Sequence, residues 1–223
     1  QSPFPPGAPP LMPIPTTVTL VDHPLIQHKL STMRDQTTST ADFRRLCREI
    51  GMLMAYEALR DLPLTTKPIQ TPVTAMEAPF LADPSVVLAP VLRAGLALCD
   101  GFLDILPSAQ VAHVGLSRNP TTLAAAEYYF NAPRDLDQRH VVILDPMLAT
   151  GNSATAAANR LKEDGARNLC LVCLLSAPEG LQSFHAAHPD TRIFTAAVDQ
   201  HLNDHGYIVP GLGDAGDRIF GTT

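Results

Sequence analysis

The chain has 223 residues, of which 45% are hydrophobic and 17% are charged, and its formal net charge is −6. The apolar content is enough to build a folded core, so we exclude an intrinsically disordered chain. No apolar run reaches the roughly 18 residues that a membrane-spanning helix needs. The acidic balance disfavours a strongly basic nucleic-acid-binding protein.

Residues 1–17 differ in composition from the rest of the chain. Residues 1–15 hold seven of the 21 prolines and almost no charge. This composition favours an extended tail, and it lacks the basic and apolar regions of a signal peptide. We therefore expect a proline-rich tail over residues 1–17 and one domain over residues 18–223.

The cysteines each lie within an apolar segment. They are Cys47, Cys99, Cys170 and Cys173. This placement predicts small core residues rather than a disulfide framework, so we expect a reducing compartment and a soluble, cytoplasmic protein. Cys170 and Cys173 fall in a predicted strand, where residues three apart point to opposite faces, so we do not expect them to share a metal.

Two helices are predicted in the first third of the chain. One covers Pro24–Arg34 with Asp22 as its cap, because proline is tolerated in a first helical turn. A longer helix follows, because apolar residues recur at helical spacing from Phe43 to Leu59. Its cap is one of three polar residues, Ser39, Thr40 or Asp42. Residues 62–80 are rich in proline and threonine and are expected to be irregular or an edge strand.

From residue 85 onward, short apolar runs alternate with helical stretches. The runs of strand length are Val86–Leu92, Val111–Leu116, Val141–Leu144, Leu169–Leu175 and Ile193–Val198. The helical stretches are Ala94–Leu106, Ser153–Asp164 and Pro178–Ala187. Apolar strands that alternate with helices indicate a parallel sheet covered on both faces. The predicted fold class is therefore α/β, with a mostly parallel central sheet and helices on both of its faces.

Charged residues follow three of these runs, at the edge where parallel sheets bind ligands. Arg93 follows the first run, Arg118 the second and Asp145 the third. Two arginines at one edge favour a binding site for a polyanion over isolated structural charges.

The loop after Asp145 leads from a buried run into a helix. Its residues Ala149–Ser153 are mostly small, so backbone N–H groups are accessible at a helix N-terminus, where an anion is stabilised. An ordinary capped turn would use the same residue types. The loop lacks the lysine and the glycine spacing of a P-loop, which disfavours ATP hydrolysis.

Two C-terminal patterns need interpretation. The segment Gly211–Gly216 fits the letters of a dinucleotide fingerprint, but only seven residues follow it, too few for the helix and strand of that fold. Its glycines are better explained by a backbone that wraps closely around a small planar ligand. His201 and His205 are spaced like zinc ligands on a helix, but no third ligand is evident.

Several strings of the sequence resemble the uracil phosphoribosyltransferase family. They are PVLRAGLALCDG at 90–101, DPMLATGNS at 145–153, SAPEG at 176–180 and HGYIVPGLGDAGDRIFGT at 205–222. DHPLIQHKL, MRDQTTST and YEALRDL near the start of the chain are also similar to this family, so the resemblance covers about residues 18–223.

The resemblance implies a type I phosphoribosyltransferase fold with a C-terminal base-binding hood segment. The implied reaction converts uracil and 5-phosphoribosyl 1-diphosphate (PRPP) to UMP and diphosphate in pyrimidine salvage. The implied catalytic residues are Asp145, Arg118 and Asp214. The implied PRPP-binding residues are Arg93, Arg118, Asp145, Pro146, Met147, Leu148, Ala149, Thr150, Gly151, Asn152, Ser153 and Asp214. The implied uracil-binding residues are Ile208, Gly213, Asp214 and Ala215.

The resemblance also implies Mg²⁺, held mainly by the substrate diphosphate, GTP as an activator, and a homodimer or homotetramer. The chain departs from the family at residues 123–130, where the family has a Glu-Pro-x-Pro-Tyr-like hood; this leaves the roles of Glu127 and Tyr128 open. Two other functions stay open: a phosphoribosyltransferase for another base, and a nucleotide-sensing regulator that keeps the fold and binds RNA. Base selectivity and salt-sensitive RNA binding distinguish them.

Overall fold

The central sheet of the protein is almost entirely parallel. The structure, a computed structural model, describes residues 13–82, 86–118 and 125–222. In spatial order the sheet contains β1 (Val18–Leu20), β11 (Arg192–Val198), β10 (Asn168–Ser176), β8 (His140–Leu144), β4 (Val86–Leu92), β6 (His113–Arg118) and β7 (Ala125–Asn131). Short strands β5 (Gln110–Val111) and β9 (Met147–Leu148) pair with β4 and β10. Among these pairs, β6 with β7 is antiparallel.

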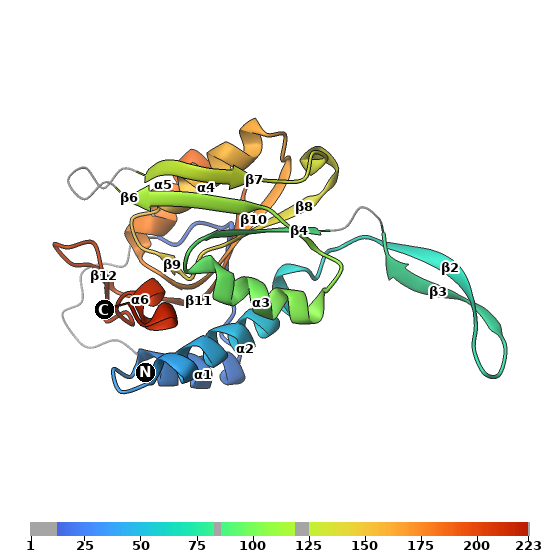
Figure 1. Cartoon of the computed structure of the whole chain (residues 1–223), viewed down its shortest axis with the longest axis horizontal. Coiled ribbons are helices and arrows are strands. Elements are labelled where there is room, and N and C mark those ends of the chain that lie inside the picture. Colours follow the sequence, from blue (N-terminus) through green and yellow to red (C-terminus); the bar gives the residue numbers. More distant parts are fainter. Residues whose placement is uncertain (1–12, 83–85, 119–124, 223) are drawn as a thin grey trace.

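Helices cover both faces of this sheet (Figure 1). One face carries α1 (Pro24–Arg34), α2 (Thr40–Ala58), α3 (Gly95–Ile105) and α6 (Ala215–Phe220). The other face carries α4 (Asn152–Glu163) and α5 (Pro178–Ala187). The predicted α/β class is confirmed, because the sheet is mostly parallel and helices pack on both of its faces.

In the central strands β4 and β8, alternate residues enter different cores. Leu88 of β4 packs with the first group of helices and Val87 with the second. Cys170 and Cys173 of β10 are divided in the same way, as the strand period predicts. All the cysteines are free and buried. Among the described residues, no helix combines the length and the apolar character needed to cross a membrane.

The first two helices start at residues with suitable caps. The Nδ1 atom of His23 accepts a hydrogen bond from the backbone N–H of Leu25 at 3.2 Å. The prediction of Asp22 as this cap is wrong, because Pro24 begins the helix and the capping position directly precedes it. Ser39 caps α2 by accepting from the N–H of Asp42 at 3.1 Å, as one of the predicted alternatives.

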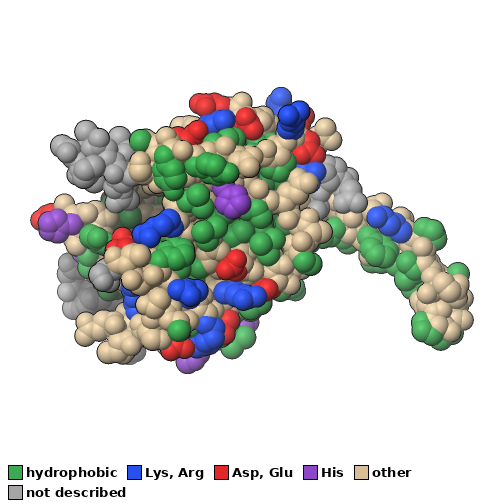
Figure 2. Space-filling model, viewed as in Figure 1, with side chains coloured by type: hydrophobic (Ala, Val, Ile, Leu, Met, Phe, Trp, Pro, Cys, Tyr) green, Lys and Arg blue, Asp and Glu red, His purple; other side chains and the backbone are tan. Residues whose placement is uncertain are grey.

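Residues 62–80 do not join the central sheet, which confirms that they are not a central strand. Strands β2 (Leu64–Gln70) and β3 (Ala75–Leu81) form an antiparallel hairpin that projects from the body of the molecule (Figure 1). Hydrophobic side chains gather on this projection (Figure 2). The most exposed are Leu64 and Val73, with 65% and 91% of their surface accessible.

The region expected to contain the hood forms an edge strand from residue 125 onward. Strand β7 is held to α4 by Arg160, whose Nε lies 3.2 Å from Glu127 and whose guanidinium lies 3.8 Å from the ring of Phe130. Glu127 is therefore part of an ion pair behind the strand rather than of a loop. Residues 123 and 124 lie outside the described part of the chain.

Candidate active site

A pocket of about 320 Å³ lies beyond the carboxyl ends of β4 and β8. Its walls come from residues 91–94, 147–154, 205–208 and 213–216, together with Leu116 and Asp145. Segments more than one hundred residues apart in the chain therefore meet in one cavity, at the sheet edge where ligands of parallel α/β proteins bind. This cavity contains most of the site residues expected from the sequence.

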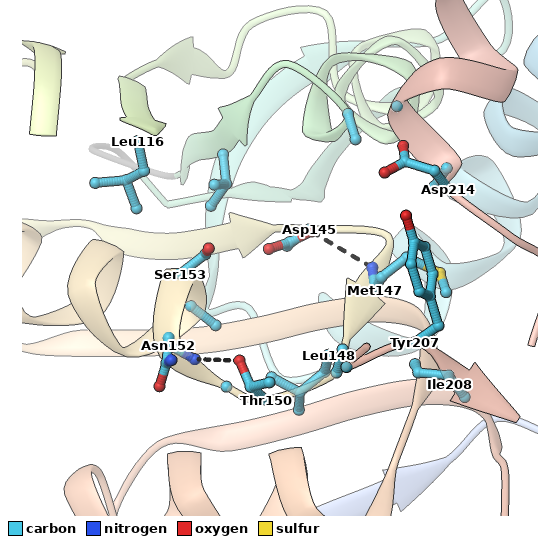
Figure 3. A pocket seen from close by; sticks show the side chains of 18 of the residues that line it. Leu116, Asp145, Met147, Leu148, Thr150, Asn152, Ser153, Tyr207, Ile208 and Asp214 are labelled. Atoms are coloured by element: carbon cyan, nitrogen blue, oxygen red, sulfur yellow. Dashed lines mark hydrogen bonds between the residues drawn. The ribbon is translucent and has the colours of Figure 1, made fainter. Parts of the chain in front are cut away.

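The loop after β8 forms one wall of the pocket. The Oδ1 atom of Asp145 accepts from the N–H of Met147 at 3.4 Å, and the Oγ1 atom of Thr150 accepts from the N–H of Asn152 at 3.4 Å (Figure 3). Gly151 has a φ of +84°, a left-handed conformation that suits glycine, and it caps α4. The helix begins at Asn152, one residue before the predicted start, so its N-terminal amides lie at the pocket.

Pro146 and Arg118 are placed differently from the other expected PRPP-binding residues. Pro146 is buried behind the loop, where its carbonyl accepts from the N–H groups of Leu174 and Leu175 at 2.9 and 3.1 Å. It secures the loop to β10 and does not line the pocket. Arg118 is the last residue of β6, but its side chain lies outside the described part of the structure.

Arg93 follows β4 directly and lines the pocket. Its side chain is 54% exposed, with Asp217 at 3.6 Å and the ring of Phe220 at 5.4 Å from its guanidinium. It also donates to the hydroxyl of Thr222 at 3.5 Å. All three contacts are weak, so the guanidinium is available to a ligand anion.

The opposite wall comes from the C-terminal segment. The short strands β12 (His201–Leu202) and β13 (Ile208–Val209) form a hairpin that leads into α6. Ile208 and Ala215 are buried, whereas Gly213 and Asp214 are exposed. Asp214 Oδ1 caps α6 by accepting from the N–H of Asp217 at 2.9 Å. Figure 3 shows the Asp145 carboxylate near the middle of the view and Asp214 on the wall that the C-terminal segment forms.

Sequence reasoning did not assign several residues of the pocket wall, among them His205 and Tyr207. Tyr207 directly precedes Ile208, so the same C-terminal string could have identified it (Figure 3). His201 lies in β12 and His205 in the turn after it, not on a helix. No group of three or more metal-ligating side chains occurs in the described ranges.

Comparison with known proteins identifies the family. A family model described as uracil phosphoribosyltransferase matches residues 20–222. Proteins of that name from Mesorhizobium japonicum and Rhizobium leguminosarum bv. trifolii are 58% and 57% identical over 205 residues, which cover 92% of this chain and 98% of each relative. The solved structure of the AQ2163 protein from Aquifex aeolicus matches with a TM-score of 0.88 and 39% identity, over 92% of this chain and 99% of that one. This chain belongs to the uracil phosphoribosyltransferase family.

Proposed function

We propose that this protein transfers the phosphoribosyl group of PRPP to uracil, which gives UMP and diphosphate in pyrimidine salvage. One observation carries the proposal beyond the family: the loop that begins at Asp145 and the segment that contains Gly213 face each other across a single pocket. An anion-binding loop and a turn of accessible backbone are the two parts that this reaction must bring together.

PRPP would lie with its 5′-phosphate at the N-terminus of α4 and its diphosphate at Arg93. Amides of residues 149–153 would bind the 5′-phosphate, and Asp145 would accept hydrogen bonds from the ribose hydroxyls. Arg93 and Arg118 would bind the diphosphate. When the C1′–O bond breaks, positive charge develops on the ribose and negative charge on the diphosphate, and these arginines stabilise the latter.

The base would lie against Ile208, Gly213, Asp214 and Ala215, with N1 of uracil facing C1′. Gly213 has a φ of +81° and no side chain, so its backbone groups are accessible to a planar ligand. N1 forms the new bond to C1′ as the bond from C1′ to the diphosphate oxygen breaks, and the N1 proton passes to the departing diphosphate or to water. Backbone donors and acceptors matched to uracil reject cytosine, because the exchanged groups would leave buried partners unpaired.

Mg²⁺ fits this pocket as an ion carried by the substrate. Asp145 and Asp214 are the carboxylates on its walls, and Mg²⁺ is commonly held by one or two carboxylates together with substrate phosphates and water. Asp214 would hold the ion beside the diphosphate. The ion supplies charge neutralisation for the leaving group.

We extend the proposal to assembly, control and location. The apolar side chains exposed on the β2–β3 hairpin support an assembly of two or four copies, which light scattering after size-exclusion chromatography tests. GTP as an activator rests on the family alone, and UMP formation with and without GTP tests it. The free, buried cysteines support a reducing compartment such as the cytoplasm.

The decisive experiment is a product assay with PRPP, Mg²⁺ and a panel of bases, resolved by chromatography. We expect UMP from uracil alone, lost in Asp145→Asn and retained in Asp190→Asn, a control at an exposed aspartate outside the pocket. A nucleotide from a different base would establish the alternative substrate. No nucleotide from any base, together with tight, salt-sensitive RNA binding, would establish the regulator instead.

A further inference from the structure

The segment proposed to bind uracil is held from behind by an ion pair. Arg34, the last residue of α1, donates from its two terminal nitrogens to the two carboxylate oxygens of Asp199 at 2.7 and 2.6 Å. The Asp199 side chain, which directly follows β11, is 6% exposed, and that of Arg34 is 26% exposed. A bidentate pair of this kind has a fixed geometry.

Both members of the pair also bind one residue of the segment, Gly211. Asp199 Oδ2 accepts from the N–H of Gly211 at 2.9 Å, and Arg34 donates to the carbonyl of Gly211 at 2.8 Å. Gly211 lies between Ile208 and Gly213, which both line the pocket. The ion pair therefore determines the backbone path between two residues expected to contact the base.

A second arginine ties the same segment to the end of α1. Arg218 donates to the carbonyls of Leu212 and Met33 at 2.8 and 2.6 Å and to that of Asp35 at 2.6 Å. The α1 end and the C-terminal segment thus hold each other in place. Neither Arg34 nor Asp199 lines the pocket, so both act on a ligand only through the backbone between them.

We propose that Arg34 and Asp199 are positioning residues that set the affinity for uracil by fixing the backbone from Ile208 to Ala215. This inference rests on the proposed function. Recognition by backbone groups depends on their exact placement, and a shift of the turn moves several of them together. Most of the proposed PRPP site is the loop built on β8 and α4, which the ion pair does not hydrogen-bond. Asp214 is the one proposed PRPP-binding residue within the anchored segment, so loss of the pair should weaken PRPP binding much less than uracil binding.

Steady-state kinetics of the 223-residue chain test the proposal with Asp199→Asn and Arg34→Lys. We expect the KM for uracil to rise about tenfold in each variant. Asp199→Asn removes the negative charge of a largely buried ion pair, and Arg34→Lys removes the guanidinium that binds both carboxylate oxygens. The KM for PRPP should stay within about twofold of wild type. The matched controls are Asp104→Asn and Arg48→Lys, because Arg48 donates bidentately to Asp104 at 2.6 Å far from the pocket. These controls should change neither KM.

A double variant adds a readout that a general loss of stability does not reproduce. If the pair acts as one unit, Arg34→Ala combined with Asp199→Ala should raise the KM for uracil about as much as one substitution alone. Arg34→Lys, which keeps the charge, should restore part of the affinity lost in Arg34→Ala. If Asp199→Asn does not fold, the two Arg34 variants carry the test.

Hydrogen exchange separates this inference from the proposed function. Peptides covering residues 208–216 should exchange faster in Asp199→Asn than in wild type, and at the wild-type rate in Asp104→Asn. Faster exchange in Asp199→Asn, in a protein that makes no UMP, would refute the proposed function. It would still show that the ion pair fixes the backbone of residues 208–216. In a protein that makes UMP, an unchanged uracil KM in folded variants, or equal rises in both KM values, would overturn the positioning role.

Discussion

Gly180, in the first turn of α5, lies directly against the carbonyl group of Ala149 in the loop after β9. A methyl group on Gly180 would clash with this carbonyl and with that of Leu148. Helix α5 therefore limits how closely the loop can approach it. The loop can pack in its observed position only because residue 180 has no side chain.

Gly180→Ala should push the loop toward the pocket. A displacement of reacting groups by about 1 Å is enough to lower activity by about 10²-fold, so we expect a loss of that order in kcat/KM for PRPP. The control is Gly165→Ala, at a glycine with a φ of +105° and open space around it. That substitution should lower the melting temperature through backbone strain and leave kcat/KM unchanged. Wild-type kinetics in Gly180→Ala would contradict the close packing.

Arg93→Ala should impair catalysis without lowering stability. The side chain is half exposed and its contacts are weak, so the melting temperature should not change. Loss of a preorganised donor to the leaving diphosphate should lower kcat/KM by about 10²-fold. Arg60→Ala is the control, because Arg60 is 57% exposed, pairs with Glu57 and lies 5.3 Å over the ring of Tyr56. Equal activities of the two variants would refute the role of Arg93.

The stability of the protein should fall as the pH falls from about 7.5 to 5.5. Burial lowers the pKa of His140 below its usual value of 6.5, and Arg192 lowers it further against the opposing effects of Asn168 and Asp61. Burial and Lys162 lower the pKa of His188 in the same way. Between the lowered pKa and 6.5 the unfolded chain binds more protons, so this stability is present above pH 6.5 and is lost below it.

Chemical denaturation at several pH values measures this effect. The carboxylates with lowered pKa values, such as that of Glu49, begin to lose their contribution only below their usual value of 4.5. The slope between about pH 7.5 and 5.5 therefore belongs to the histidines. His140→Gln should flatten the slope, and the double variant with His188→Gln should flatten it further. A slope as steep as that of wild type in both variants would contradict the assignment.

The cysteine thiols should not react in the folded protein. Burial raises the pKa of Cys47, Cys99, Cys170 and Cys173 to about 12, so almost no thiolate is present at neutral pH. A thiol reagent such as 5,5′-dithiobis(2-nitrobenzoic acid) should label none of them in buffer and all of them in denaturant. Labelling of the native protein at any of these positions would show that the surrounding core opens.

Local patterns predicted the buried elements with accuracy. Strand β4 and helix α5 have the expected bounds, Val86–Leu92 and Pro178–Ala187. A strand buried on both faces is a continuous apolar run, and proline favours the first turn of a helix, so neighbouring residues contain the necessary information. Strand β7 was not predicted as a strand, and residues 62–80 were expected only as irregular or an edge strand, without the β2–β3 hairpin pairing. Exposed strands lack a continuous apolar run, and their formation depends on which partner they meet.

The sequence by itself determined the α/β class, the charged strand ends at Arg93 and Asp145, and the loop into α4, because these depend on local composition and on the common edge of a parallel sheet. Only the tertiary structure decided that Arg34 meets Asp199, 165 residues away, and that both bind Gly211. Such contacts depend on strand order, which brings the end of β11 beside the end of α1. No spacing along the chain encodes that neighbourhood, so it becomes visible only when the helices and strands have packed.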